Sequence, residues 1–126
     1  MPKISKHFTR AEVACKCGCG FDSMDIETLK IADEARDFAN ESITPSSACR
    51  CRKHNTRVTK KPRSISQHLK ARAMDLPVSN PKALFDYLRN KYPNQYGFGL
   101  YKTFVHVDTR TNGPARWKLI WHSVRK

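Results

Sequence analysis

Two short stretches, far apart along the chain, constrain its fold more than any other feature of the sequence. Residues 66–76 contain His68 and Asp75, and residues 104–108 contain His106. Two imidazoles and a carboxylate can bind zinc through three ligands and leave the fourth position to water, as in catalytic zinc sites. A single histidine is more often a surface or core residue, so residue types alone leave this interpretation open. If the three side chains bind one ion, the fold must bring them to a common point.

The second stretch, residues 104–108, has the alternation of a half-buried strand. In a strand, Val105 and Val107 would face the core, and the opposite face would be shared by Phe104, His106 and Asp108. Asp108 would then lie in the same cleft as His106. A carboxylate in that position suits either a general base or a hydrogen-bonding partner of the imidazole.

Helix and strand signals occur along the 126 residues without a regular βαβ rhythm. Helices are expected at Asp25–Asn40, Arg52–Val58 and Asn80–Lys91, with a capping box at Thr9–Glu12 and a loop at 59–65. Strands are expected at Ile43–Cys49, Ala73–Pro77, Tyr96–Tyr101, Phe104–Asp108 and Trp117–Trp121. We therefore expect a small single domain over residues 1–126, of class α+β, with a mainly antiparallel sheet flanked by helices.

The chain carries a net charge of +13 at pH 7, which predicts attraction to polyanions. Nucleic acid and the anionic bacterial envelope are both candidate partners, and charge alone does not separate them. The apolar runs are too short to cross a bilayer, and the N-terminus lacks the apolar stretch of a secretory signal. We expect a monomer that is made in the cytoplasm and does not insert into membranes.

Five cysteines lie in two groups, Cys15/Cys17/Cys19 and Cys49/Cys51. An odd number of cysteines without a secretory signal argues against a full disulfide framework. The Cys-x-Cys spacing differs from the Cys-x-x-Cys of most zinc knuckles, so it indicates a structural metal only weakly. We expect reduced thiols packed near one another. A disulfide between the groups is the next alternative, and a second zinc ion is the last.

Three blocks of residues, in this order, carry a resemblance to one enzyme family. The blocks are Ser47, Arg50 and Asn55; Ser66, His68, Ala73 and Asp75; and Gly97, Gly99, Tyr101, Phe104, His106 and Asp108. They resemble the zinc D-Ala-D-Ala carboxypeptidase and L-alanyl-D-glutamate endopeptidase family, especially its compact phage and prophage branch, as do residues 8–12 and 15–20. The resemblance implies a Hedgehog/DD-peptidase type of fold and a zinc peptidase that acts on peptidoglycan stem peptides.

The same resemblance implies roles for individual side chains. The ligands of one catalytic zinc ion would be His68, Asp75 and His106. Arg50 would hold substrate carbonyl or carboxylate oxygens with its rigid set of donors, and Ser66 would contact substrate or a metal ligand. On chemical grounds the Arg50 cation also has a catalytic role, because with zinc it could stabilise the oxyanion of the reaction. On chemical grounds, Tyr101 could donate a hydrogen bond to the oxyanion at the scissile carbonyl, although a core aromatic is an equal alternative.

Three positions depart from the family pattern. The Ser-Gly pair that precedes the family arginine is Ser47-Ala48 here. A family glycine between the first two ligands is Ala71 here, so it is open whether the backbone keeps the same turn. Many relatives carry a catalytic acid or histidine three residues before the last ligand, where this chain has Thr103, which is no useful base near neutral pH. Asp108 is the carboxylate that strand geometry places in the cleft, so we nominate it as the general base.

The leading hypothesis is a zinc-dependent peptidoglycan peptidase, an endolysin or related cell-wall hydrolase of phage or prophage origin. It would reach the wall after release from the host cytoplasm, and its positive charge would hold it on the anionic envelope. One alternative is a basic, metal-containing nucleic-acid-binding module, favoured by the charge and the cysteines. Another is a catalytically inactive wall-binding phage component that kept the fold.

Overall fold

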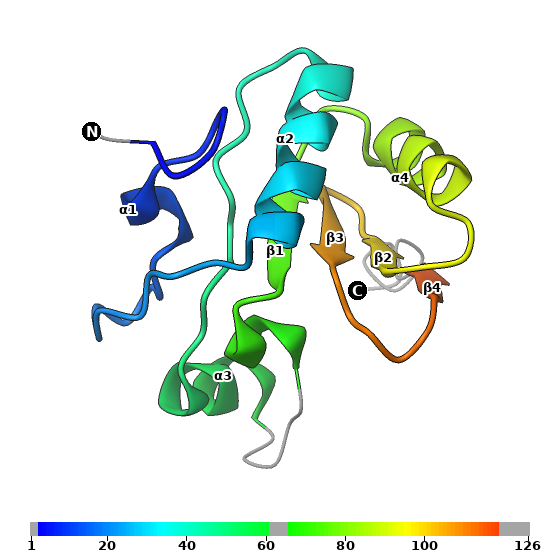
Figure 1. Cartoon of the computed structure of the whole chain (residues 1–126). Helices are drawn as coiled ribbons and strands as arrows, with labels where there is room; N and C mark the ends of the chain where they lie inside the picture. Colours follow the sequence, from blue (N-terminus) through cyan, green and yellow to red (C-terminus); the bar gives the residue numbers. More distant parts are fainter. Residues whose placement is uncertain (1–2, 61–65, 119–126) are drawn as a thin grey trace.

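A four-stranded sheet forms the centre of the fold (Figure 1). The structure is a computed structural model that describes residues 3–60 and 66–118. Across the sheet the strands lie in the order β1 (Ala73–Pro77), β3 (Phe104–Asp108), β2 (Gly97–Leu100) and β4 (Ala115–Lys118). β3 is antiparallel to β1 and β2, whereas β4 is parallel to β2. This arrangement confirms the α+β class and a mainly antiparallel sheet.

The helices begin at cap residues that the sequence supplies. They are α1 (Arg10–Val13), α2 (Ile26–Ala39), α3 (Arg52–Thr59) and α4 (Pro81–Lys91), together with a short 3-10 helix, η1 (Gln67–Lys70). Asp25 and Asn80 accept hydrogen bonds from backbone N–H groups in the first turns of α2 and α4. Thr9 and Glu12 form the capping box of α1. The structure thus confirms the expected helices and their starts.

Two helices cover the sheet and bury the core. α2 packs against β1 and β3, and α4 packs against β2 and β3. Val105 and Val107 are fully buried, as expected for the inner face of β3, and they belong to the same apolar cluster as Leu29 of α2 and Leu88 of α4. Within the described ranges, no helix combines the length and apolar character that crossing a bilayer requires.

Two expected strands differ from the structure. Residues 43–49 run beside β1 but share one isolated bridge with it, between Ser47 and Asp75, and do not form a strand. Pro45 lacks the N–H group that a continuous ladder needs. β4 begins at Ala115, directly after the turn at Pro114, rather than at Trp117. Residues 61–65 of the expected loop and 119–121 of the expected last strand lie outside the described residues.

Candidate metal centre

Three elements bring the expected metal ligands together. His68 lies in η1, Asp75 on β1 and His106 on β3, and Asp75 and His106 are direct partners in the antiparallel register. One ligand atom of each side chain lies within 4.8 Å of the others. His106 Nδ1 is 2.8 Å from Asp75 Oδ1, and His68 Nε2 is 3.4 Å from Asp75 Oδ2. We call these three residues the metal centre.

Each imidazole of the metal centre is oriented by a hydrogen bond from its other ring nitrogen. His68 Nδ1 lies 2.7 Å from the carbonyl oxygen of Ala48, and His106 Nε2 lies 2.8 Å from Asp108 Oδ2. When these nitrogens carry the protons, the lone pairs of His68 Nε2 and His106 Nδ1 are both directed toward Asp75. Hydrogen bonds of this kind fix the tautomer and ring orientation of metal-binding histidines.

The surroundings of the His68 side chain indicate whether a metal ion fits at the metal centre. His68 is only 1% exposed, and its Nε2 makes no hydrogen bond with any described residue. Leaving a buried polar atom without a partner costs about 1–3 kcal/mol. A cation between His68, Asp75 and His106 would use this lone pair. Two imidazole nitrogens and one carboxylate oxygen are normal ligands of zinc, so the donor set fits that ion.

Burial and charge act in opposite directions on the ionisable groups of the metal centre. Burial favours a neutral Asp75, but contacts with His106 and His68 outweigh it and hold the pKa of Asp75 well below its usual range. Burial lowers the pKa of His68. Burial also acts to lower the pKa of His106, but the carboxylates of Asp108 and Asp75 prevail and raise it. The negative potential that attracts a proton here also favours a divalent cation.

Asp108, the nominated base, is enclosed by hydrogen bonds. Its carboxylate accepts from Arg110 Nε at 2.8 Å, from Arg110 Nη2 at 2.7 Å and from His106 Nε2 at 2.8 Å. Burial acts to raise the pKa of Asp108, but Arg110 and His106 outweigh it and hold the pKa well below its usual range. Gly97 leaves room for the pair, because a Cβ there would lie 2.5 Å from Asp108 Oδ1.

Arg110 is absent from the expected site residues, although the sequence contains a signal for it. The alternation that puts His106 and Asp108 on one face of β3 continues to position 110. A guanidinium two residues beyond a carboxylate on that face can form the paired hydrogen bonds that the structure shows.

Trp117 of β4 also lies at the metal centre, and sequence reasoning placed it only in a strand. Its ring centroid is 5.1 Å from that of His106, and its Nε1 donates to the hydroxyl of Tyr101 at 3.1 Å. The parallel pairing of β4 with β2 places Trp117 opposite Gly99, where any Cβ would collide with the indole. Local sequence patterns contain no signal for this pairing.

Arg50 and Tyr101 lie close enough to Asp75 for its charge to influence both. Arg50 is 8% exposed, its backbone N–H donates to the carbonyl oxygen of His68 at 3.2 Å, and its Nε is buried without a hydrogen bond to any described residue. Burial lowers the pKa of Arg50, and the charge of Asp75 opposes this effect. Burial raises the pKa of Tyr101, so its phenol stays neutral and able to donate.

The turn that carries His68 is shaped by residues on both sides of it. Ser66 Oγ accepts a hydrogen bond from the backbone N–H of His68 at 3.2 Å. Ala71 has a φ of 56° in the left-handed region, which costs a non-glycine residue about 1–2 kcal/mol. Ala71 therefore adopts a backbone conformation that glycine would take without strain. Thr103 is exposed, between β2 and β3.

One family of known proteins matches this chain. The family model described as Peptidase M15 matches residues 6–108. That range includes the metal centre and Arg50, and it ends at Asp108, so Arg110 and β4 lie beyond it. No curated protein and no solved structure matches the chain significantly.

Proposed function

Since the chain belongs to the peptidase M15 family, whose members are zinc-dependent metallopeptidases, we propose that it hydrolyses a peptide bond in the stem peptides of peptidoglycan. The observation that carries the proposal is the convergence of His68, Asp75 and His106, with the buried Nε2 of His68 left for a metal ion. Three protein ligands leave one position for water, which is the arrangement of catalytic zinc sites.

A zinc ion held there would acidify a bound water and polarise the scissile carbonyl. The residues around it would bind and orient the substrate. Arg50 would donate to carbonyl or carboxylate oxygens of the stem peptide, because its buried Nε has no hydrogen bond to a described residue. Tyr101 would offer its hydroxyl proton to the oxyanion that develops at the scissile carbonyl.

Asp108 would orient His106 rather than act as the general base. A general base must come within about 2.6–3.2 Å of the proton it removes, directly or through one water. The Asp108 side chain is 0% exposed and already hydrogen-bonds to Arg110 and His106. Arg110 would keep this carboxylate ionised as a fixed acceptor for the Nε2–H of His106. Ser66 would similarly position His68 by capping its turn.

The net charge of +13 is consistent with binding to an anionic envelope and with binding to nucleic acid. We favour the envelope because the M15 family assignment connects the chain with peptidase activity. Action on the cell wall as a phage or prophage lysis enzyme, after release from the host cytoplasm, stays a prediction, as does the monomeric state.

Digestion of purified peptidoglycan tests the proposed function. The wild-type protein should release muropeptides, chelation should abolish the release, and added Zn²⁺ should restore it. His68→Ala should be inactive, whereas His7→Gln should retain activity because His7 pairs with Asp37 at the surface. Mass spectrometry of the products would distinguish cleavage at the D-Ala-D-Ala terminus from cleavage of the L-Ala-D-Glu link.

Two other outcomes would contradict this function. DNA binding that survives chelation, without release of muropeptides, would favour a nucleic-acid-binding module. Binding to the wall without cleavage, in zinc-loaded protein, would favour a catalytically inactive wall-binding component.

A further inference from the structure

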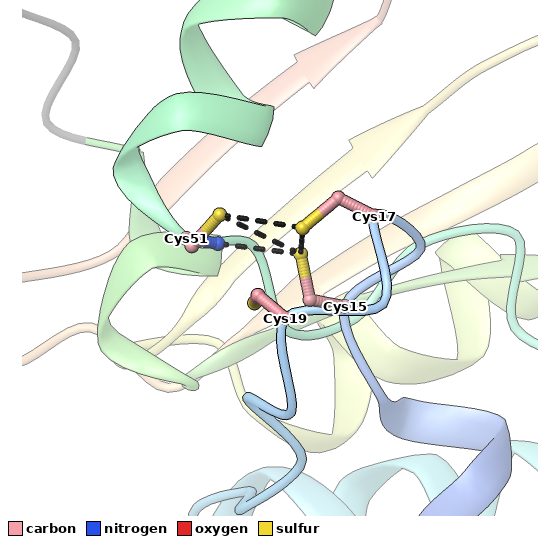
Figure 2. Close-up of side chains that lie close together, drawn as sticks. All are labelled: Cys15, Cys17, Cys19 and Cys51. Atoms are coloured by element: carbon pink, nitrogen blue, oxygen red, sulfur yellow. Dashed lines mark hydrogen bonds between the residues drawn. The ribbon is translucent and has the colours of Figure 1, made fainter.

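A second group of metal-binding side chains lies outside the metal centre. Cys15, Cys17 and Cys19 lie on the loop between α1 and α2, and Cys51 is the N-cap residue of α3. Their sulfur atoms all lie within 4.8 Å of one another. Figure 2 shows the sulfurs of Cys15, Cys17 and Cys51 facing one another, with Cys19 beside Cys15. We call these four residues the cysteine cluster.

The spacing of the sulfur atoms matches a tetrahedral metal site. Cys15 Sγ lies 3.4 Å from Cys17 Sγ and 3.9 Å from Cys51 Sγ, and the last two are 3.6 Å apart. Four thiolates that each lie about 2.3 Å from a zinc ion are about 3.8 Å from one another. A covalent S–S bond is about 2.05 Å long, and all four cysteines are free.

Burial does not explain why these cysteines gather. Cys17 and Cys19 are exposed, whereas Cys15 is buried and Cys51 half-buried. Exposed thiols gain little from mutual contact, because hydrophobic association depends on apolar surface that is removed from water. Cys49 provides the contrast, since it is buried and its thiol donates to the carbonyl oxygen of Ser23 at 3.2 Å.

The backbone of residues 15–21 presents the three loop thiols to one point. Gly18 and Gly20 have φ values of 79° and 93°, a left-handed conformation that glycine adopts without strain. The N–H of Gly18 donates to the carbonyl oxygen of Cys15 at 3.1 Å. The N–H of Cys15 donates to the carbonyl oxygen of Phe21 at 2.8 Å. The Cys-x-Cys-x-Cys spacing therefore forms a three-donor loop, because Gly18 turns the chain between Cys17 and Cys19 and Gly20 turns it directly after Cys19.

Backbone donors and basic side chains favour thiolates at this position. At the N-terminus of α3, the N–H of Cys51 lies 3.5 Å from Cys15 Sγ, and the N–H of His54 donates to Cys51 Sγ at 3.4 Å. Such donors stabilise negative sulfur. Four thiolates around a zinc ion carry a net charge of about −2. Basic residues flank the ligands in the sequence: Lys16, Arg52 and Lys53.

We infer that Cys15, Cys17, Cys19 and Cys51 bind one Zn²⁺ ion as four thiolates, and that their thiol protons pass to solvent on binding. Protein then fills all four positions of the ion, so this site is structural and holds no water to activate. The ion holds residues 15–19 against the first turn of α3, next to Arg50. This site can be tested independently of the proposed function, because metal content is measured without substrate.

Zinc analysis of purified variants tests the inference. We expect about two zinc ions per wild-type chain, and about one in Cys17→Ser and in His68→Ala. Cys49→Ser is the matched control and should keep the wild-type zinc content, because Cys49 lies outside the cysteine cluster. In cobalt-substituted protein, the thiolate-to-metal charge-transfer absorption should vanish in Cys17→Ser and persist in His68→Ala.

Two further measurements keep the inference testable if Cys17→Ser does not fold. A thiol-specific mercurial should release about one zinc ion per chain from the wild-type protein. Cys19→His retains a donor, so it should keep the full zinc content with weaker charge-transfer absorption in the cobalt form. Equal zinc in the wild type and in folded Cys17→Ser would overturn the inference, as would the failure of the mercurial to release zinc. A disulfide among the four cysteines in non-reducing peptide maps would also overturn it.

Discussion

The metal centre and the cysteine cluster differ in what holds their donors in place. The donors of the metal centre come from η1, β1 and β3, and hydrogen bonds to Ala48 and Asp108 orient both imidazoles. Three donors of the cysteine cluster lie on one loop, where two of them are exposed. Strand pairing and these hydrogen bonds therefore hold the donors of the metal centre, whereas the proposed zinc ion would hold the loop thiols. Three protein ligands suit catalysis, and four suit a structural role.

The two regions meet at residues 49–51. The backbone N–H of Arg50 donates to the carbonyl oxygen of His68, while the next residue, Cys51, belongs to the cysteine cluster. The N–H of the preceding residue, Cys49, donates to the carbonyl oxygen of Val13 at 3.0 Å. A zinc ion in the cysteine cluster would lie one residue from Arg50 in the chain and would not touch substrate.

The largest expected effect is the loss of activity in Asp75→Asn. This change removes the carboxylate between the two imidazoles, so muropeptide release should fall at least ~10³-fold. The melting temperature should be affected far less than the activity, because the backbone pairing of β1 with β3 remains. Asp37→Asn is the control, since Asp37 is a surface carboxylate that pairs with Lys6 and His7. Loss of cooperative unfolding in Asp75→Asn would remove the contrast between the two regions.

Cys17→Ser should show the opposite pattern, with a large effect on stability. Losing a zinc ion that is present at 100–1,000 times its Kd would cost about 3–4 kcal/mol, which lowers the melting temperature by on the order of 10 °C. The fraction of Cys17→Ser molecules that stays folded should retain much of the wild-type activity. Thermal unfolding followed by circular dichroism measures the shift, with Cys49→Ser as the control. A melting temperature equal to that of the wild type would contradict a structural ion.

Arg50→Gln should separate substrate binding from metal binding. Without the guanidinium, kcat/KM for muropeptide release should fall ~10²-fold, because a donor to the developing oxyanion is lost. Zinc content should remain at the wild-type value, since Arg50 supplies no ligand atom. Arg50→Lys should recover little, because an ammonium lacks the planar set of donors. Full activity in Arg50→Gln would refute its role at the substrate.

Asp108→Asn should weaken zinc binding at the metal centre by about 10–100-fold, because a neutral amide replaces the charged carboxylate that orients His106. Excess zinc should restore part of the activity, and the pH profile should keep its shape. Activity assays at increasing zinc concentration measure this. If Asp108 were the general base, activity would be lost at every zinc concentration while zinc stayed bound.

The smallest expected effect concerns the turn between His68 and Asp75. Ala71→Gly should raise the free energy of unfolding by about 0.5–1 kcal/mol, because glycine relieves the strain of a positive φ. Urea denaturation measures the change. Ala83→Gly, inside α4, should instead lower stability by about 0.5–1 kcal/mol. A destabilised Ala71→Gly would show that the turn carries no strain.

Local signals in the sequence determined the helices and most of the sheet. The capping box at Thr9–Glu12 and the caps Asp25 and Asn80 are satisfied within one turn, so they need no distant partner. The alternation in residues 104–108 likewise determined that Val105 and Val107 would be buried. The sequence blocks also singled out three candidate ligands, and the structure brings them within 4.8 Å of one another.

Only the tertiary structure decided which distant residues meet. It placed Trp117 beside His106 through the parallel pairing of β4, and it brought Cys51, but not Cys49, to the loop thiols. These contacts depend on strand register and on the packing of the whole domain, and a local pattern of residues specifies neither.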